Sequence, residues 1–211
     1  MSVFAKIYDL MMYRLEKLSL ADCRSNLLEL TYGRILEIGT GTGANLDKFK
    51  EGVNITLTDP DNVMLKLLEK KMSSLGINGK VKRAASENLP FTDNSFDTVV
   101  STLVLCSVKD LEKSIKEIKR VLVPGGKLLF IEHVRDKNLR AWFQDKFCPA
   151  WSWFAEGCRL NSMTMDGLKD SGFTIIKAEH FNPAEKIWLI NSWPVHFFLP
   201  FINGFAINNK K

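Results

Sequence analysis

The stretch "ILEIGTGTGANL", residues 35–46, decides the fold class. Its apolar start is typical of a short buried strand, and glycines follow at alternate positions: Gly39, Gly41 and Gly43. A glycine-rich turn after the first strand of a doubly wound sheet lets the backbone approach a ligand closely. The stretch therefore predicts a Rossmann-like cofactor loop, and it also fits a relaxed dinucleotide fingerprint.

The rest of the chain alternates short apolar runs with segments of helical period, which is typical of βα units around a parallel sheet. Helices are expected over 61–76, with Val63, Leu67 and Leu68 as its apolar stripe, and over 110–126. The expected strands are 34–39, 53–59, 80–85, 96–102, 127–134, 173–181 and 200–207.

Length predicts a single domain, because 211 residues suffice for one sizeable α/β core but not for two. We expect a helical lid over 1–30, a donor-binding core over 33–134, and acceptor-side helices with the last strands over 135–211. The net charge of +5 is spread over helix faces, and no motif indicates nucleic acid as a partner. The oligomeric state is left open.

The four cysteines have no metal-binding spacing and no signal peptide beside them, so we expect reduced thiols, no metal and a cytoplasmic location. No apolar run has the roughly 18 residues of a membrane span. A weak contact of a proline-broken aromatic segment with a membrane surface is left open.

Glu37 distinguishes between the cofactors that this loop could bind. A pyrophosphate would lie close to its carboxylate, which is a costly arrangement in a cleft of low dielectric. S-adenosylmethionine instead presents an ammonium and a sulfonium, which a carboxylate stabilises. Asp59 closes the second strand and suits the two ribose hydroxyls, although NAD enzymes use the same arrangement. The alternative for Asp59 is an acid at a helix N-terminus.

Four motifs in order, "LEIGTGTG", "TDP", "ENLPFTDNSFDTVVS" and "RVLVPGGKLLFIEHV", resemble class I S-adenosylmethionine-dependent methyltransferases, in particular the quinone-biosynthesis group. With "TLVLCSV", "CPAW", "EGCRL" and "PFINGFAI", most of the chain after residue 32 resembles the methyltransferase-like proteins that methylate thiols. The start of the chain differs from the thiol-methylating proteins of animals. Those proteins begin with a membrane-anchoring apolar segment, which "MSVFAKIYDLMMYRLEK" does not supply. The resemblance implies a seven-stranded, mostly parallel sheet with an antiparallel last strand and helices on both faces.

The resemblance also assigns the donor site. Many relatives have an acid two residues before the Glu of "ENLPF", where this chain has Ala85. Because that acid is missing here, adenine's exocyclic amine is expected to bond to backbone or to the Ser86 hydroxyl instead. S-adenosyl-L-homocysteine would be the product. The expected cofactor-binding residues are Glu37, Gly39, Thr40, Gly41 and Gly43 for the methionine part, Asp59 and Pro60 for the ribose, Ser86, Glu87 and Asn88 for the adenine edge, and Thr102 and Leu103 beside the methyl group.

The acceptor is less well defined. His133 follows the fifth strand, where it either acts as a general base or anchors the next loop. Cys106 is expected to be a small core residue and not a nucleophile. All five tryptophans lie after residue 140, within "AWFQDKFCPAWSWFAEGCRL" and "EKIWLINSWPVHFFLP". Either they cover a hydrophobic acceptor pocket or they complete the core.

We therefore predict an S-adenosylmethionine-dependent methyltransferase that acts on a small, apolar acceptor, with a thiol as the first choice. A quinone or phenol, methylated on oxygen or carbon, is the alternative acceptor. Two alternatives belong to other classes: an NAD(P)-linked oxidoreductase, and a cofactor-binding protein without catalysis.

Overall fold

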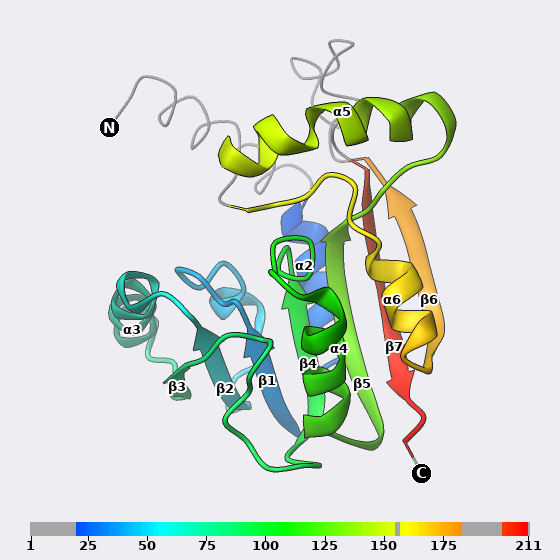
Figure 1. Ribbon diagram of the computed structural model, residues 1–211. Coiled ribbons are helices and arrows are strands. Elements are labelled where there is room, and N and C mark those ends of the chain that lie inside the picture. Colours follow the sequence, from blue (N-terminus) through cyan, green and yellow to red (C-terminus); the bar gives the residue numbers. More distant parts are fainter. Residues whose placement is uncertain (1–19, 155–156, 183–199, 211) are drawn as a thin grey trace.

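The computed structural model describes residues 20–154, 157–182 and 200–210. Its core is a seven-stranded sheet with the order β3-β2-β1-β4-β5-β7-β6 (Figure 1). The strands are β1 (Arg34–Ile38), β2 (Asn54–Asp59), β3 (Lys80–Arg83), β4 (Phe96–Thr102), β5 (Leu122–His133), β6 (Phe173–Phe181) and β7 (Phe201–Asn208). The helices are α2 (Ala21–Leu28), α3 (Asn62–Leu75), α4 (Leu111–Val121), α5 (Asn138–Phe154) and α6 (Thr164–Asp170), with a 3-10 turn η2 (Leu46–Lys48).

Strands β1 to β5 are parallel, whereas β7 lies antiparallel between β5 and β6. The predicted sheet, with its antiparallel last strand, is thus confirmed. Strand β5 begins earlier than expected, because Leu122 already pairs with Phe96 before the register shifts. The strand order reverses between β1 and β4, and ligands bind at such a switch point, beyond the carboxyl ends of the strands.

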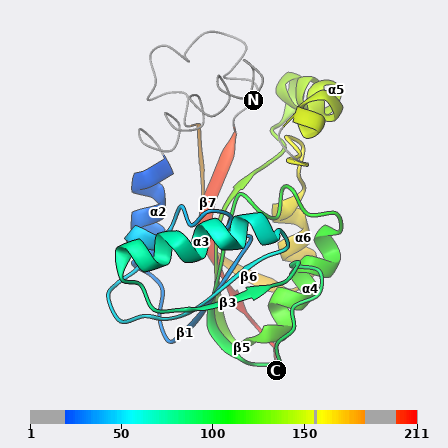
Figure 2. The same cartoon turned by 90° about the vertical axis from the view of Figure 1, so that its left-hand side faces the viewer.

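Two apolar layers cover the faces of the sheet. Helices α2 and α3 pack on one face, where Leu28, Leu68 and Ile131 belong to one buried apolar cluster. Helices α4 and α6 pack on the other, where Ile118 and Leu168 meet other side chains of the sheet (Figure 2). Consecutive residues of β5 divide between the two layers, as the period of two in a strand requires.

The prediction for the helix after β2 is correct in extent but partly wrong in orientation. Asp61 caps α3 by accepting a hydrogen bond from the Val63 backbone N–H, and Gly76 ends the helix in the left-handed conformation. Val63 and Leu67 are 64% and 48% exposed. The buried stripe is instead Leu65, Leu68 and Met72, because these positions face the sheet.

The predicted lid over 1–30 lies mostly outside the described residues. Its described end, α2, packs against the sheet and buries Leu20, Leu27 and Leu28 in the core. In Figure 1, α5 lies beyond the carboxyl ends of the central strands. The structure therefore places one element of the predicted acceptor-side segment next to the ligand-binding edge.

Candidate active site

A cavity of about 840 Å³ opens at the carboxyl ends of the strands. It extends from the turn after β1, past the ends of β2 and β4, to the end of β5 and the segment after α5. Its size is in the range typical of small-molecule and cofactor sites. The predicted site residues that line it are Gly39, Gly41, Asp59, Pro60, Ser86, Glu87, Leu103 and His133.

The glycine loop and Asp59 form one hydrogen-bonded unit. The Gly41 N–H donates to Asp59 Oδ2 at 2.9 Å, and the Asp61 N–H donates to Asp59 Oδ1, also at 2.9 Å. Each carboxylate oxygen retains a second lone pair for a hydroxyl donor. Gly41 has a φ of +56°, and a Cβ added there would meet no atom within 4 Å. The backbone is therefore open to a ligand at this glycine.

The other predicted cofactor residues lie outside the cavity lining. Gly43 allows close packing, since a Cβ there would lie 2.6 Å from the Leu46 side chain. Thr102 Oγ1 accepts hydrogen bonds from Arg24 and from Asn45. The predicted residues that do not line the cavity are Glu37, Thr40, Gly43, Asn88 and Thr102.

Glu37 is buried at the end of β1, beneath the glycine loop. Its Oε1 accepts a hydrogen bond of 2.7 Å from Asn45 Nδ2. Its Oε2 is buried and has no hydrogen-bond partner among the described residues. Burial raises the pKa of Glu37 to about 7, although Asn45 and Arg24 favour the charged form. An unsatisfied acceptor beneath an open backbone fits the cationic methionine part of S-adenosylmethionine.

We expect donor affinity to depend on pH through Glu37. The folded-state pKa is raised, so protonated Glu37 contributes to the free energy of unfolding of the free protein. This contribution is fully present below about pH 4.5 and is lost as pH rises through about 7. The cationic donor interacts with the ionised carboxylate, so donor affinity rises with pH, which is the opposite of the trend in folding stability. Affinity should therefore rise by up to roughly tenfold between about pH 6 and pH 8, as the ionised fraction rises.

Calorimetric titration of S-adenosylmethionine across this pH range measures the effect. The Glu37→Gln variant is the matched control, because it keeps the shape of the side chain but does not titrate. Any titration of the donor's own amine is common to both proteins and cancels in the ratio of their affinities. Identical pH profiles for the two proteins would contradict a charge interaction with Glu37.

The motif segment "SENLPFTDNSFD", residues 86–97, has two parts with different surroundings. Ser86 and Glu87 line the cavity, where Ser86 Oγ lies 2.9 Å from Ser114 Oγ and Glu87 Oε1 accepts a hydrogen bond from the Lys109 N–H. Asn88 follows outside the cavity lining and turns back by donating its N–H to the Ala85 carbonyl. Only the start of the motif is thus placed to contact a ligand.

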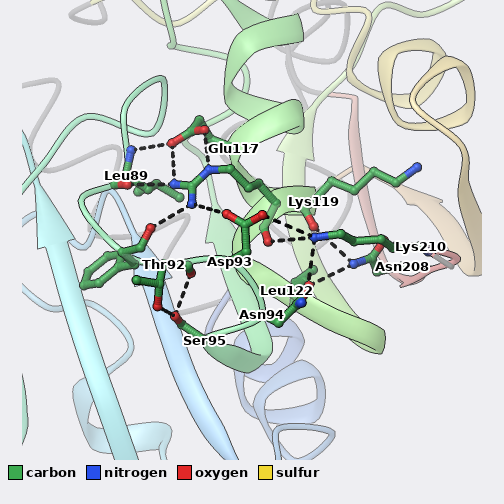
Figure 3. Close-up of polar contacts among 12 residues, drawn as sticks. Leu89, Thr92, Asp93, Asn94, Ser95, Glu117, Lys119, Leu122, Asn208 and Lys210 are labelled. Atoms are coloured by element: carbon green, nitrogen blue, oxygen red, sulfur yellow. Dashed lines mark hydrogen bonds and ion pairs between the residues drawn. The ribbon is translucent and has the colours of Figure 1, made fainter.

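The remainder of this motif is attached to α4 (Figure 3). The Arg120 guanidinium donates to Glu117, to Asp93 and to the backbone carbonyls of Leu89 and Phe91. Glu117 in turn accepts the Leu89 N–H at 2.8 Å. These contacts give Asp93 a structural role, because they fix the loop that leads into β4.

Glu132 is a residue that sequence reasoning missed. It is fully buried near the end of β5, and burial raises its pKa. Its Oε1 accepts hydrogen bonds from the Ser101 hydroxyl and from the backbone N–H groups of Val104 and Leu105, at 2.7, 3.2 and 3.1 Å. Its Oε2 accepts the Cys106 N–H at 3.1 Å. This carboxyl group therefore determines the course of the loop after β4.

That loop shapes the middle of the cavity. Leu103 has a φ of +62°, an uncommon conformation for a non-glycine residue, and its N–H donates to the Ile131 carbonyl at 2.7 Å. Val104, the next residue, also lines the cavity. It lies so close to Gly39 that a Cβ added at Gly39 would be 2.5 Å from the Val104 side chain. The loop after β4 thus lies against the glycine loop after β1.

The far end of the cavity is lined by His133, Trp151, Cys158 and Phe201. His133 Nδ1 lies 3.1 Å from Cys158 Sγ, and its ring packs on Phe201 with centroids 4.0 Å apart. Cys106 is buried, as predicted, and its Sγ lies 3.7 Å from Cys158 Sγ. This contact raises the pKa of Cys106 and lowers that of Cys158, which gives the two thiols different roles in one hydrogen bond.

The tryptophans do not share one environment. Trp151 lines the cavity, which supports the predicted aromatic wall of an acceptor pocket. Trp142 and Trp153, also on α5, are exposed, and Trp153 is 89% exposed. Trp188 and Trp193 lie outside the described residues. One of the described tryptophans therefore contacts the cavity.

The mostly parallel sheet, its switch point and the acid-bearing glycine loop are typical of a Rossmann-like methyltransferase. Comparison with known proteins agrees. Residues 36–130 match a family model described as a methyltransferase domain. The YcgJ protein from Bacillus subtilis has a similar fold, with a TM-score of 0.72 over 90% of this chain and 100% of that chain, at 16% identity.

Two human proteins are similar in sequence. Thiol S-methyltransferase TMT1B is 37% identical over 161 residues, which cover 74% of this chain and 65% of TMT1B. Thiol S-methyltransferase TMT1A is 34% identical over 179 residues, which cover 82% of this chain and 70% of TMT1A. The chain therefore belongs to the family of S-adenosylmethionine-dependent methyltransferases that includes these two proteins, and S-adenosylmethionine is its cofactor. None of the helices in the described ranges is both long and apolar enough to cross a membrane.

Proposed function

We propose that this protein transfers the methyl group of S-adenosylmethionine to the sulfur of a small apolar thiol. The observation that carries the proposal is that one continuous cavity extends from Gly41 and Asp59 to Trp151 and Phe201. One end offers an open backbone and a carboxylate, which suit the donor. The other end offers aromatic side chains, which suit an apolar acceptor. The names of the two human relatives favour sulfur as the acceptor atom.

The reaction requires little of the protein beyond alignment. The acceptor sulfur attacks the methyl carbon in line, a new carbon–sulfur bond forms, and the bond to the sulfonium breaks to release neutral S-adenosylhomocysteine. Holding both reactants in one enclosed cavity supplies proximity and excludes water. A thiol with a pKa near 8.5 is already a few per cent thiolate at neutral pH, so a general base such as His133 is helpful but not essential.

We expect Asp59→Ala to weaken S-adenosylmethionine binding by about 3 kcal/mol, roughly a hundredfold. The variant removes both the acceptor for the ribose hydroxyls and the anchor of the Gly41 N–H. Calorimetry with S-adenosylhomocysteine and with its 2′-deoxy analogue separates these effects. Loss of the hydroxyl should weaken binding to the unmodified protein and have little effect in the variant. An equal loss in both proteins would place the ribose elsewhere.

A transfer assay tests the function. The protein is incubated with donor labelled in the methyl group and with thiophenol, phenol or a hydroquinone, which are apolar acceptors of similar size. We expect labelled product from thiophenol alone. Turnover restricted to phenol or to the quinol would overturn the proposal in favour of the alternative acceptor. Donor binding without turnover of any acceptor would indicate a protein that binds the cofactor without catalysis.

We also propose a cytoplasmic location. The buried cysteines Cys106, Cys148 and Cys158 form no disulfide in the described part of the chain, which supports a reducing compartment. The exposed Trp142, Phe147 and Trp153 on α5 support a weak additional contact with a membrane surface. Cell fractionation tests both proposals. Most of a cytoplasmic protein with such a contact remains in the supernatant, and a small part sediments with membranes.

A further inference from the structure

Three side chains that can bind a metal converge at the acceptor end of the cavity: Cys106, His133 and Cys158. The two sulfur atoms are 3.7 Å apart. His133 Nδ1 lies 3.1 Å from Cys158 Sγ and 3.9 Å from Cys106 Sγ. The three ligand atoms thus form a compact triangle.

The triangle has the dimensions of one face of a zinc tetrahedron. With Zn–S bonds of about 2.3 Å and Zn–N bonds of about 2.0 Å, tetrahedral angles place two sulfurs about 3.8 Å apart and a sulfur and a nitrogen about 3.5 Å apart. The observed sulfur–sulfur distance of 3.7 Å is close to this value, and the two sulfur–nitrogen distances of 3.1 and 3.9 Å lie on either side of it. Small side-chain rotations would make them equal.

The backbone holds the three ligands in place from different parts of the chain. Glu132 fixes the Cys106 N–H, and the Arg159 N–H donates to the Cys106 carbonyl at 2.8 Å, which brings Cys158 next to Cys106. His133 is the last residue of β5. The ligands are therefore presented by a supported backbone and not by loosely held side chains, as a metal site requires.

The ligand set is that of a catalytic zinc site. Two cysteines and one histidine bind zinc in enzymes that leave the fourth position to water or substrate. The described part of the chain supplies these three ligands and no fourth. Because His133 and Cys158 line the cavity while Cys106 lies buried behind them, the remaining position faces the cavity.

We propose that Cys106, His133 and Cys158 bind one zinc ion, and that the acceptor thiol binds this ion as its fourth ligand. The inference rests on the proposed thiol methylation. The thiol loses its proton to solvent as it binds, and the zinc-bound thiolate attacks the methyl carbon of the donor. The carbon–sulfur bond to the acceptor forms as the bond to the sulfonium breaks. The thioether product carries no negative charge on sulfur, binds zinc more weakly and leaves.

This role gives His133 a different function from the predicted general base. Coordination lowers the pKa of a ligated thiol far below its usual range, so no separate base is needed. The absence of a metal-binding spacing in the sequence is explained by topology. The three ligands come from the loop after β4, the end of β5 and the segment after α5, so no short motif contains two of them.

Metal content is the first test. The protein is produced with zinc in the medium and dialysed without chelator. Its metal content is then measured by inductively coupled plasma mass spectrometry. We expect one zinc per chain, and at least a fivefold loss in Cys158→Ser and in Cys106→Ser. Cys148→Ser is the matched control and should retain zinc, because Cys148 is a buried cysteine that donates to Asn161 Oδ1 outside the cluster. Circular dichroism confirms that each variant is folded.

Cobalt substitution is the second test. Cobalt(II) at this site should show thiolate charge-transfer absorption and the intense visible bands of a tetrahedral ion. Addition of thiophenol, with no donor present, should add charge-transfer intensity, because a third sulfur joins the ion. Neither measurement uses methyl transfer, so a protein that binds zinc and thiol without methylating them would contradict the proposed function and leave the metal site intact.

Three results would overturn the inference. The first is that the protein without substitutions contains no zinc. This includes the case in which Cys106 and Cys158 form a disulfide, which lowers the mass of the protein by two hydrogens. The second is equal zinc content in Cys158→Ser, which would place the ion elsewhere. The third is a cobalt spectrum that thiophenol leaves unchanged, which would show that the fourth position is closed to the acceptor.

Discussion

Replacement of Glu132 by alanine is expected to lower the free energy of unfolding by about 4 kcal/mol, because three backbone N–H groups and one hydroxyl lose their buried acceptor. That loss is a large share of the roughly 5–15 kcal/mol that stabilises a typical domain. The loop after β4 would also lose its support beside the glycine loop after β1. Urea denaturation followed by tryptophan fluorescence measures the change.

Two further variants make this prediction specific. Glu132→Gln keeps a carbonyl oxygen but directs an amide N–H toward one of the donors, so we expect a loss of about 2 kcal/mol. Glu179→Ala, at an exposed position on β6, should change stability by less than about 0.5 kcal/mol. If Glu132→Ala were as stable as Glu179→Ala, the loop would not depend on Glu132.

The sequence was sufficient for the fold because its signals are local. The alternation of apolar runs and helical periods predicted all seven strands, and the glycines marked the turn after β1. Asp59 could be placed in the cavity from its position alone, because a residue that ends a strand of a parallel sheet faces the ligand-binding edge. The acid-bearing glycine loop selected the cofactor by charge.

The rest of the site could not be predicted because it depends on contacts between distant segments. Glu132 was hidden in an apolar strand, where nothing indicated that its carboxyl group would support the loop before Cys106. Gly43 belongs to the motif but allows close packing with Leu46, which the spacing does not distinguish from ligand contact. Cys158 approaches His133 only because the segment after α5 returns to the sheet.

Gly41→Val is expected to weaken S-adenosylmethionine binding by at least a hundredfold, about 2.7 kcal/mol. Two effects combine. A β-branched residue is strained at a φ of +56°, and the added side chain occupies the open space of the cavity in front of the loop. Gly41→Ala introduces the backbone strain with a single methyl group and should have a smaller effect. Calorimetric titration of the donor measures both.

Gly52→Val separates strain from obstruction. Gly52 also has a positive φ, +73°, and a Cβ there would meet no atom within 4 Å, but it lies in an exposed turn before β2 and does not line the cavity. The substitution should therefore lower stability by about 1–2 kcal/mol, as strain at a left-handed position does, and leave donor affinity unchanged. If Gly52→Val weakened donor binding as much as Gly41→Val, general destabilisation would explain both, and Gly41 would have no particular role in contact with the donor.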